Sequence, residues 1–268
     1  MSLGFTVDAL IPAGRGGGVL RMGLTRVAES DWLQPEFDRA AREAVFATHP
    51  EAMIVLPGAQ GAASEAAQIV GNTDDLAKAA QGCWEDLCVL EAEREEGPYR
   101  LTAAALGFPT DWHLHEKMGQ PLLAIHAPIH GYAEQLSKGV DHFFATLKPG
   151  EIFGRANWFV VANDNWRYMP EDAPETRFAH VTAENAGESL FVRCERQTLR
   201  RLPQTQAVLF TIGIAVAPLV RISTANLRRV ADAITAISGG EHERRAAPFY
   251  ADVFDRYTLS RELEEKAA

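Results

Sequence analysis

Histidine is the residue type in this sequence with the clearest capacity for chemistry, because a neutral imidazole is the commonest metal ligand in proteins. Of the eight histidines, His126 and His130 are spaced as H-x-x-x-H, and His113 and His115 stand a short way before them. The H-x-x-x-H spacing binds a metal when both rings lie on one helical face, but Pro128 disfavours a regular helix here. The alternative is that these rings cap turns or satisfy buried backbone groups.

Residues 190–200 alternate polar and charged side chains on both sides of an extended chain. As a strand, this segment places Arg193, Glu195 and Gln197 on one face, and Cys194, Arg196, Thr198 and Arg200 on the other. One interpretation is an edge strand with two solvated faces. The other is the wall of a site that offers guanidinium groups to an acid and a carboxylate to a cation.

A third group, Arg155, Asn157 and Trp158, begins a predicted strand after the turn residues Pro149 and Gly150. An indole ring beside an amide suits a pocket for a small amine. The structural alternative is that Trp158 belongs to the core and that Asn157 bonds a turn.

The elements that must position these side chains follow from hydrophobic patterning. Residues typical of strands concentrate in 99–106, 156–162, 190–200 and 207–216. Helical spacing of apolar residues occurs in 34–48, 73–93, 132–147, 224–237 and 259–268. Because the strands cluster in the second half and do not alternate regularly with helices, we expect an α+β fold with a mostly antiparallel sheet.

The glycine-rich residues 14–18 are the main feature of the N-terminus. They lack the Gly-Lys-Ser/Thr sequence and the strand–turn–helix context of a phosphate-binding loop. We therefore expect residues 1–18 to form a flexible arm and residues 19–268 to form one domain with N- and C-terminal helical extensions.

Composition excludes several classes of function. The formal charge of −10 disfavours a nucleic-acid partner, and the longest apolar run, residues 207–220, is too short to span a bilayer. Three cysteines without C-x-x-C spacing are too few for a four-thiolate iron–sulfur cluster and indicate a reduced, cytoplasmic setting. The sequence also lacks a dinucleotide fingerprint, so any reductive chemistry must draw electrons from another protein.

Short distinctive segments occur in order between about Leu20 and Leu219. The two most specific are Ile125-His126-Ala127-Pro128 and Glu195-Arg196-Gln197-Thr198-Leu199. The others are Leu101-Thr102-Ala103-Ala104, Phe108-Pro109 with Trp112, Glu116-Lys117-Met118-Gly119-Gln120-Pro121-Leu122, Gly131-Tyr132, Arg155 with Asn157-Trp158, and Leu202-Pro203. Together they resemble the haem-dependent oxidative N-demethylase alpha-subunit-like family.

This resemblance implies a PAS-like domain, with an antiparallel sheet and flanking helices, that holds haem b non-covalently. Members of the family oxidise dimethylamine with dioxygen and receive electrons from NADPH through flavin and iron–sulfur partner subunits. The resemblance therefore implies a haem-dependent oxidoreductase of the monooxygenase type, here acting on a small secondary amine.

Residue roles are also expectations from the resemblance and from residue type. His126 is the expected axial ligand of the iron, with His113, His115 and His130 as alternatives. Arg155, Arg196 and Arg200 are expected to bind the cofactor, the last two through its propionates. Glu195, Asn157 and Trp158 are the expected catalytic pocket residues.

The sequence departs from the family pattern at three positions. His130 stands where a second proline is usual, and Gly213 and Ala215 stand where Arg and Tyr are usual. Because Gly213 and Ala215 lie on one face of a predicted strand, both losses enlarge the same wall of a cavity. These losses favour an alternative function, a haem-binding sensor or a non-catalytic subunit. A third interpretation is a non-haem metal protein that uses the histidines of residues 113–130.

Overall fold

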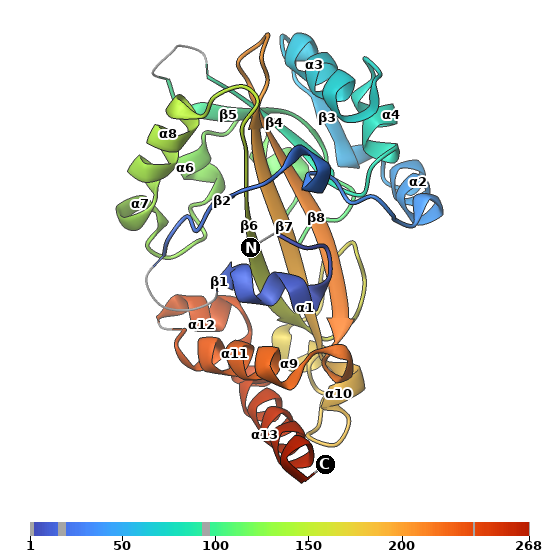
Figure 1. Ribbon diagram of the computed structural model, residues 1–268, viewed down its shortest axis with the longest axis vertical. Helices are drawn as coiled ribbons and strands as arrows, with labels where there is room; N and C mark the ends of the chain where they lie inside the picture. Colours follow the sequence, from blue (N-terminus) through green and yellow to red (C-terminus); the bar gives the residue numbers. More distant parts are fainter. Residues whose placement is uncertain (1–2, 16–19, 93–96, 238, 268) are drawn as a thin grey trace.

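One sheet runs through the whole protein (Figure 1). The computed structural model describes residues 3–15, 20–92, 97–237 and 239–267. Its strands pair in the order β1-β6-β7-β8-β4-β5-β3, with β2 also paired to β6. The strands are β1 (Gly14–Arg15), β2 (Thr25–Arg26), β3 (Met53–Val55), β4 (Asp86–Ala92), β5 (Tyr99–Ala105), β6 (Ile152–Val161), β7 (Phe191–Arg201) and β8 (Val208–Pro218).

Within the described residues, all strand pairs are antiparallel except β1–β6. The chain forms β4 and β5, then an insert of short helices, and returns through β6, β7 and β8. The insert holds α5 (Leu114–Lys117), α6 (Leu122–Ile125), α7 (Tyr132–Gln135) and α8 (Ser137–Thr146). This antiparallel sheet with flanking helices confirms the α+β, PAS-like fold class.

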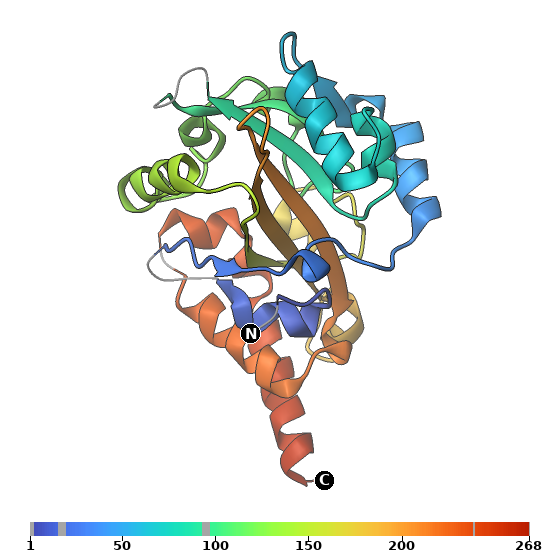
Figure 2. The ribbon, with the colours of Figure 1, turned by 45° about the horizontal axis from the view of Figure 1, so that its top comes forward.

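Helices cover both ends of the sheet (Figures 1 and 2). In both views α3 and α4 lie at one end, and α11, α12 and α13 lie at the other. The helices outside the insert are α1 (Val7–Leu10), α2 (Arg39–Thr48), α3 (Gln60–Gly71), α4 (Leu76–Gln81), α9 (Pro174–Arg177), α10 (Ala186–Ser189), α11 (Thr224–Thr235), α12 (Gly240–Arg244) and α13 (Ala251–Ala267). None of these described helices has the length and apolar character needed to cross a membrane.

The two faces of the sheet differ in what covers them. We call the side that carries Trp158, Arg196 and Gly213 the N-terminal face, because buried residues of α1 and α11 pack there with those of α3 and α4. We call the opposite side, which carries Arg155 and Glu195, the insert face. Its upper part is covered by apolar residues of α5, α6 and α8.

The N-terminus departs from the expected flexible arm. Thr6 caps α1 through its hydroxyl, which accepts a hydrogen bond from Ala9 N at 3.3 Å. Val7, Leu10 and Ile11 are buried in the main core. Residues 3–13 are therefore part of the packed body, because their apolar side chains cover the sheet. Residues 16–18 of the glycine cluster lie outside the described residues.

The predicted strands correspond to β5, β6, β7 and β8, and most predicted helices are also present. The exception is residues 73–93, where the predicted helix is wrong beyond Gln81. From Asp86 to Ala92 the chain is β4, paired with β5 and β8 and buried over its first five residues. A fully buried strand is apolar on both sides, so its leucines also match helical spacing.

Candidate functional site

β7 carries the charged residues that the sequence assigned either to an edge strand or to the wall of a site. This strand lies between β6 and β8 and pairs with both along its length. The interpretation as an edge strand is therefore wrong. Three of its arginines, Arg193, Arg196 and Arg201, are at most 5% exposed.

Arg193 points to the insert face, where each of its guanidinium nitrogens donates hydrogen bonds to neighbouring residues. Nε donates to Thr110 Oγ1 at 2.8 Å, and the Nη atoms donate to the carbonyls of Phe108, Pro109, Asn165 and Trp166 at 2.7–3.0 Å. Burial lowers the pKa of Arg193 to about 10, so the group remains charged at neutral pH. This arginine joins two loops to the sheet.

Arg196 and Arg200, the expected propionate partners, point to the N-terminal face. Arg196 donates to the carbonyls of Leu3 at 3.2 Å and Trp32 at 2.7 Å, and to that of Asp31. Arg200 forms an ion pair with Glu29 at 2.6 Å, and its guanidinium lies 4.4 Å from the centre of the Trp32 ring. An acid bound at Arg196 would have to displace three carbonyl groups. The propionate role of both residues stays a prediction.

Four polar residues meet on the insert face of β6 and β7, and we call them the polar quartet: Arg155, Asn157, Glu195 and Gln197. The strand register places Arg155 beside Gln197 and Asn157 beside Glu195. Gln197 Nε2 donates to Glu195 Oε2 at 2.9 Å. Three of the four are partly exposed, and Glu195 is 8% exposed. The quartet thus offers a cation, a carboxylate and two amides on one surface.

Trp158 does not join this group. It lies on the N-terminal face and is 2% exposed in the main core. Its carbonyl accepts a hydrogen bond from Arg245 Nη1 at 2.8 Å. This is the core position that the structural alternative predicted for Trp158.

His126 follows α6 on the insert, and its tautomer is set by the backbone. Nδ1 lies 2.8 Å from the carbonyl oxygen of Leu122. Because a carbonyl only accepts, Nδ1 carries the proton and Nε2 keeps its lone pair. Burial, and then the positive charges of Arg155 and Lys117, lower the pKa of His126, while the Leu122 bond raises it. A neutral imidazole oriented by a carbonyl is the form that binds metals.

The surroundings of His126 hold the ring in place. The Tyr132 ring stacks on it with centroids 4.4 Å apart and planes 13° apart. Gly131 makes the turn between the two residues with φ +78°, a left-handed conformation that favours glycine. Lys117 Nζ donates to the carbonyl of Ile125 at 3.3 Å, next to the His126 peptide.

The other histidines of the insert lie apart from this arrangement. The rings of His113 and His115 are 5.5 Å apart, and both residues are exposed. His130 is exposed and packs on α12, where a Cβ built on Gly240 would lie 2.5 Å from Nε2. Among the described residues, no three or more His, Cys, Asp or Glu side chains are grouped so that they could hold a metal ion.

Charge is distributed unevenly around the polar quartet. Arg155 and Lys117 both influence the pKa of His126. In contrast, Glu241 first and then Asp111 and Glu195 contribute to raising the pKa of Arg244, which lies in α12. We call the part of the quartet beside His126 its basic end and the part at Glu195 its acidic end, where the Glu195 carboxylate also interacts with the charges of Arg193 and Arg244. Sequence reasoning missed Lys117, although its segment was one of the distinctive ones, because a lone lysine carries no spacing signal.

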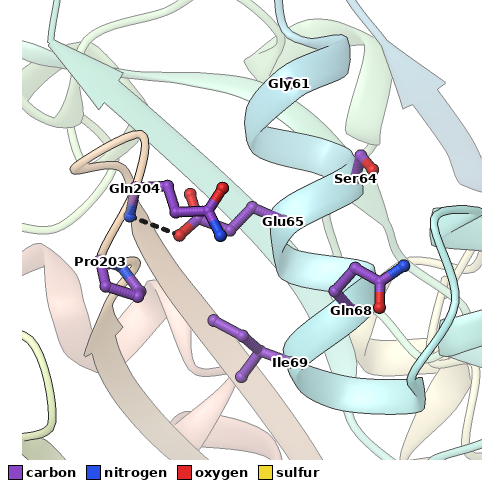
Figure 3. Close-up of a pocket in the computed structure, with 7 residues that line it drawn as sticks. All are labelled: Gly61, Ser64, Glu65, Gln68, Ile69, Pro203 and Gln204. Carbon is purple, nitrogen blue, oxygen red and sulfur yellow. Dashed lines mark hydrogen bonds between the residues drawn. The ribbon is translucent and has the colours of Figure 1, made fainter.

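Two hollows lie elsewhere on the surface. One, of about 240 Å³, separates α3 from the β7–β8 hairpin, where Glu65 accepts a hydrogen bond from Gln204 N at 2.6 Å (Figure 3). The other, of about 330 Å³, lies along residues 214–217 of β8 and is lined by Ala215 and by the rings of Trp84 and Trp166.

Gly213 and Ala215 lie on the N-terminal face, on the other side of the sheet from the polar quartet. They pair with Arg196 and Cys194 of β7, respectively. A Cβ built on Gly213 would lie 3.4 Å from the Cγ and Oε1 of Glu85. The wall that these two small residues were expected to enlarge is therefore not a wall of the quartet.

Comparison with known families adds an independent result. A family model described as haem-dependent oxidative N-demethylase, alpha subunit-like, matches residues 71–253, more than half of the 268 residues. The match includes β4 to β8, the insert with His126 and the whole polar quartet. Its description implies haem, oxidative demethylation and an enzyme of more than one subunit. The chain belongs to the haem-dependent oxidative N-demethylase, alpha subunit-like family.

Proposed function

We propose that this protein binds haem b on the insert face and oxidatively N-demethylates a small secondary amine, with dioxygen as oxidant. The observation that carries the proposal is the state of His126. Its Nδ1 proton is committed to Leu122, and burial favours the neutral ring. The imidazole is thus prepared to bind iron through Nε2.

The residues around His126 fit haem by their chemistry. Half-buried apolar side chains on the insert and on the insert face offer contacts to a macrocycle, namely Ile125, Val140, Phe143, Phe153 and Phe210. His126 would hold the iron, and Arg155 provides a cation for an acidic edge. When bound, haem supplies a redox-active iron at which dioxygen is used to oxidise an N-methyl group.

The acidic end of the quartet supports an amine substrate. A secondary amine is a cation at neutral pH, so the Glu195 carboxylate would bind its N–H groups. Gln197 holds one carboxylate oxygen of Glu195 at 2.9 Å and fixes the orientation of the group. Asn157, the strand neighbour of Glu195, would orient the substrate through its amide. Trp158, on the opposite face, would support β6 from behind.

Electrons are proposed to come from separate flavin and iron–sulfur subunits, in agreement with the absence of a dinucleotide fingerprint and with only three cysteines in the sequence. The alternative, a haem-binding sensor or non-catalytic subunit, was favoured by Gly213 and Ala215. Because both positions lie on the N-terminal face, they remove no group from the quartet. We therefore retain the enzyme as the proposed function.

The test compares wild type with His126→Ala, using His130→Ala and His113→Ala as controls. We expect the wild-type chain to give a Soret band on haem addition, and only His126→Ala to lose it. With dithionite-reduced protein or a supplied reductase, amine and dioxygen should yield formaldehyde. The isolated chain should not oxidise NADPH.

Two results would overturn parts of this proposal. A full complement of haem with an unchanged ferric spectrum in His126→Ala would exclude the ligand assignment. Haem binding without formaldehyde from any small secondary amine would instead favour the sensor or non-catalytic subunit.

A further inference from the structure

Lys117 is a half-buried cation in a position that the fold does not explain. It is the last residue of α5, and its Nζ donates to the Ile125 carbonyl at 3.3 Å. Among the ion pairs formed by the described residues, none includes Lys117. A partly desolvated ammonium with one long hydrogen bond gains most from an anionic partner.

A second cation approaches the same place from the sheet. Arg155 lies on β6, and its charge acts on His126 and, against the negative charge of Asp141, on Tyr132. Lys117 on the insert and Arg155 on the sheet thus both lie close enough to His126 for their charges to act on its ring.

Three arginines of the surrounding elements bond groups of the protein itself. Arg193 donates to four carbonyls and one hydroxyl, and Arg196 donates to three carbonyls on the N-terminal face. Arg244 forms two hydrogen bonds with the Glu241 carboxylate, at 2.7 and 2.5 Å. Lys117, with its hydrogen bond of 3.3 Å to one carbonyl, is therefore the better place for an acid.

We infer that Lys117, together with Arg155, binds the carboxylates of the ligand that lies against His126. This inference rests on the proposed function, in which the ligand is haem b and the carboxylates are its propionates. It assigns the amine to the Glu195 end and the acid groups to the Lys117 end, in place of the propionate role that the sequence predicted for Arg196 and Arg200. The ligand is then oriented by opposite charges at the two ends of one surface.

The experiment measures dissociation constants for haem and for haem dimethyl ester, whose propionates are uncharged. We expect wild type to bind haem more tightly than the ester. Lys117→Gln should reduce this ratio by about tenfold, as expected for the loss of a charge-assisted hydrogen bond, with little change in affinity for the ester. Lys117→Arg should retain most of the ratio, because it keeps the charge.

Two controls separate this role from general electrostatics. Lys138→Gln makes the same change at an exposed site in α8, and Arg200→Gln tests the propionate role on the N-terminal face. Neither should change the ratio. An unchanged ratio in Lys117→Gln, or a loss of the ratio in Arg200→Gln, would overturn the inference. The proposed function would survive that result, but it would fail if wild type bound neither haem nor its ester.

Discussion

The buried arginines of β7 and the polar quartet share this strand, but their hydrogen bonds differ in kind. Arg193, Arg196 and Arg201 are surrounded by backbone carbonyls, which accept most of their N–H groups. Within the quartet, Gln197 Nε2 donates a hydrogen bond to Glu195 Oε2 at 2.9 Å. Polar groups that a fold uses for its own stability are saturated by it, whereas partly exposed amides such as those of Asn157 and Gln197 keep bonding capacity for a ligand.

Distance along the chain explains why the arginines are structural. Arg196 bonds residues 3, 31 and 32, while Arg201 bonds the carbonyls of Leu147, Gln206 and Phe144. Carbonyls in irregular segments have no ladder partner, and a guanidinium offers five donors to them. Each arginine therefore fastens loops to the sheet at a point where secondary structure leaves the backbone unsatisfied.

The largest effect predicted by this comparison is on stability at Arg193. Arg193→Ala leaves the carbonyls of Phe108 and Trp166 without their buried donor. We expect the free energy of unfolding to fall by at least about 3 kcal/mol, because buried unsatisfied groups cost about 1–3 kcal/mol each and water can satisfy only some of them. Urea denaturation followed by tryptophan fluorescence measures the change.

Arg200→Ala is the matched control, because it removes the same residue type from the same strand. Arg200 bonds the exposed carboxylate of Glu29 and stacks on Trp32. We expect a loss of about 1 kcal/mol or less, in the range of partly exposed ion pairs. Equal losses at the two positions would contradict the distinction between saturated and accessible cations.

The alternation of β7 was predictable from the sequence, but the role of each face was not. A period of two residues separates Glu195 and Gln197 from Arg196 and Arg200 without any structure. The partners that commit Arg196 lie more than 160 residues away, in segments with no regular pattern. Only the folded chain shows that Arg196 is fastened to the N-terminal segment, whereas Asn157 and Gln197 on the other face are partly exposed.

The β4 region and Lys117 show two other limits. Residues 86–92 are buried over most of their length, so their apolar residues fit both a helix and a central strand. Lys117 is a single residue, and its proposed role can be inferred only once the fold places it beside the Ile125 carbonyl and near Arg155. His126 was predictable because its motif is specific, although its tautomer required the Leu122 carbonyl.

Glu85 provides a test with a smaller expected effect on stability, because it is a buried carboxylate with only part of its hydrogen-bonding capacity satisfied. Its Oε1 accepts a hydrogen bond from Gln34 N at 2.8 Å, while its Oε2 is buried without a hydrogen bond. Burial raises the pKa of Glu85 above its ordinary value of 4.5. The folded state is therefore favoured by protonation, and this contribution is lost as the pH rises through the raised pKa.

Glu85→Gln keeps the acceptor for Gln34 and removes the titration. At matched pH we expect the variant to gain stability relative to wild type as the pH rises from 4.5 to 8. Thermal melts across this range measure the difference, with Glu43→Gln on the exposed side of α2 as the control. A difference in stability that stays constant with pH would contradict a raised pKa for Glu85.

The smallest expected effect is at Gly213, which connects the buried face to the question of function. A Cβ at this position would lie 3.4 Å from Glu85 and 3.8 Å from Arg196 Cβ, both ordinary contact distances. Glycine in a strand is entropically costly, so Gly213→Ala should raise the free energy of unfolding by about 0.5 kcal/mol. Gly154→Ala, on the same face of β6, is the control that should destabilise, because its Cβ would lie 2.8 Å from Leu3 Cδ2.

Haem affinity should be unchanged in Gly213→Ala, because the side chain is on the opposite face from the polar quartet. A change in haem affinity without a change in stability would place the ligand on the N-terminal face and reverse the roles that we assign to the two sides of β7.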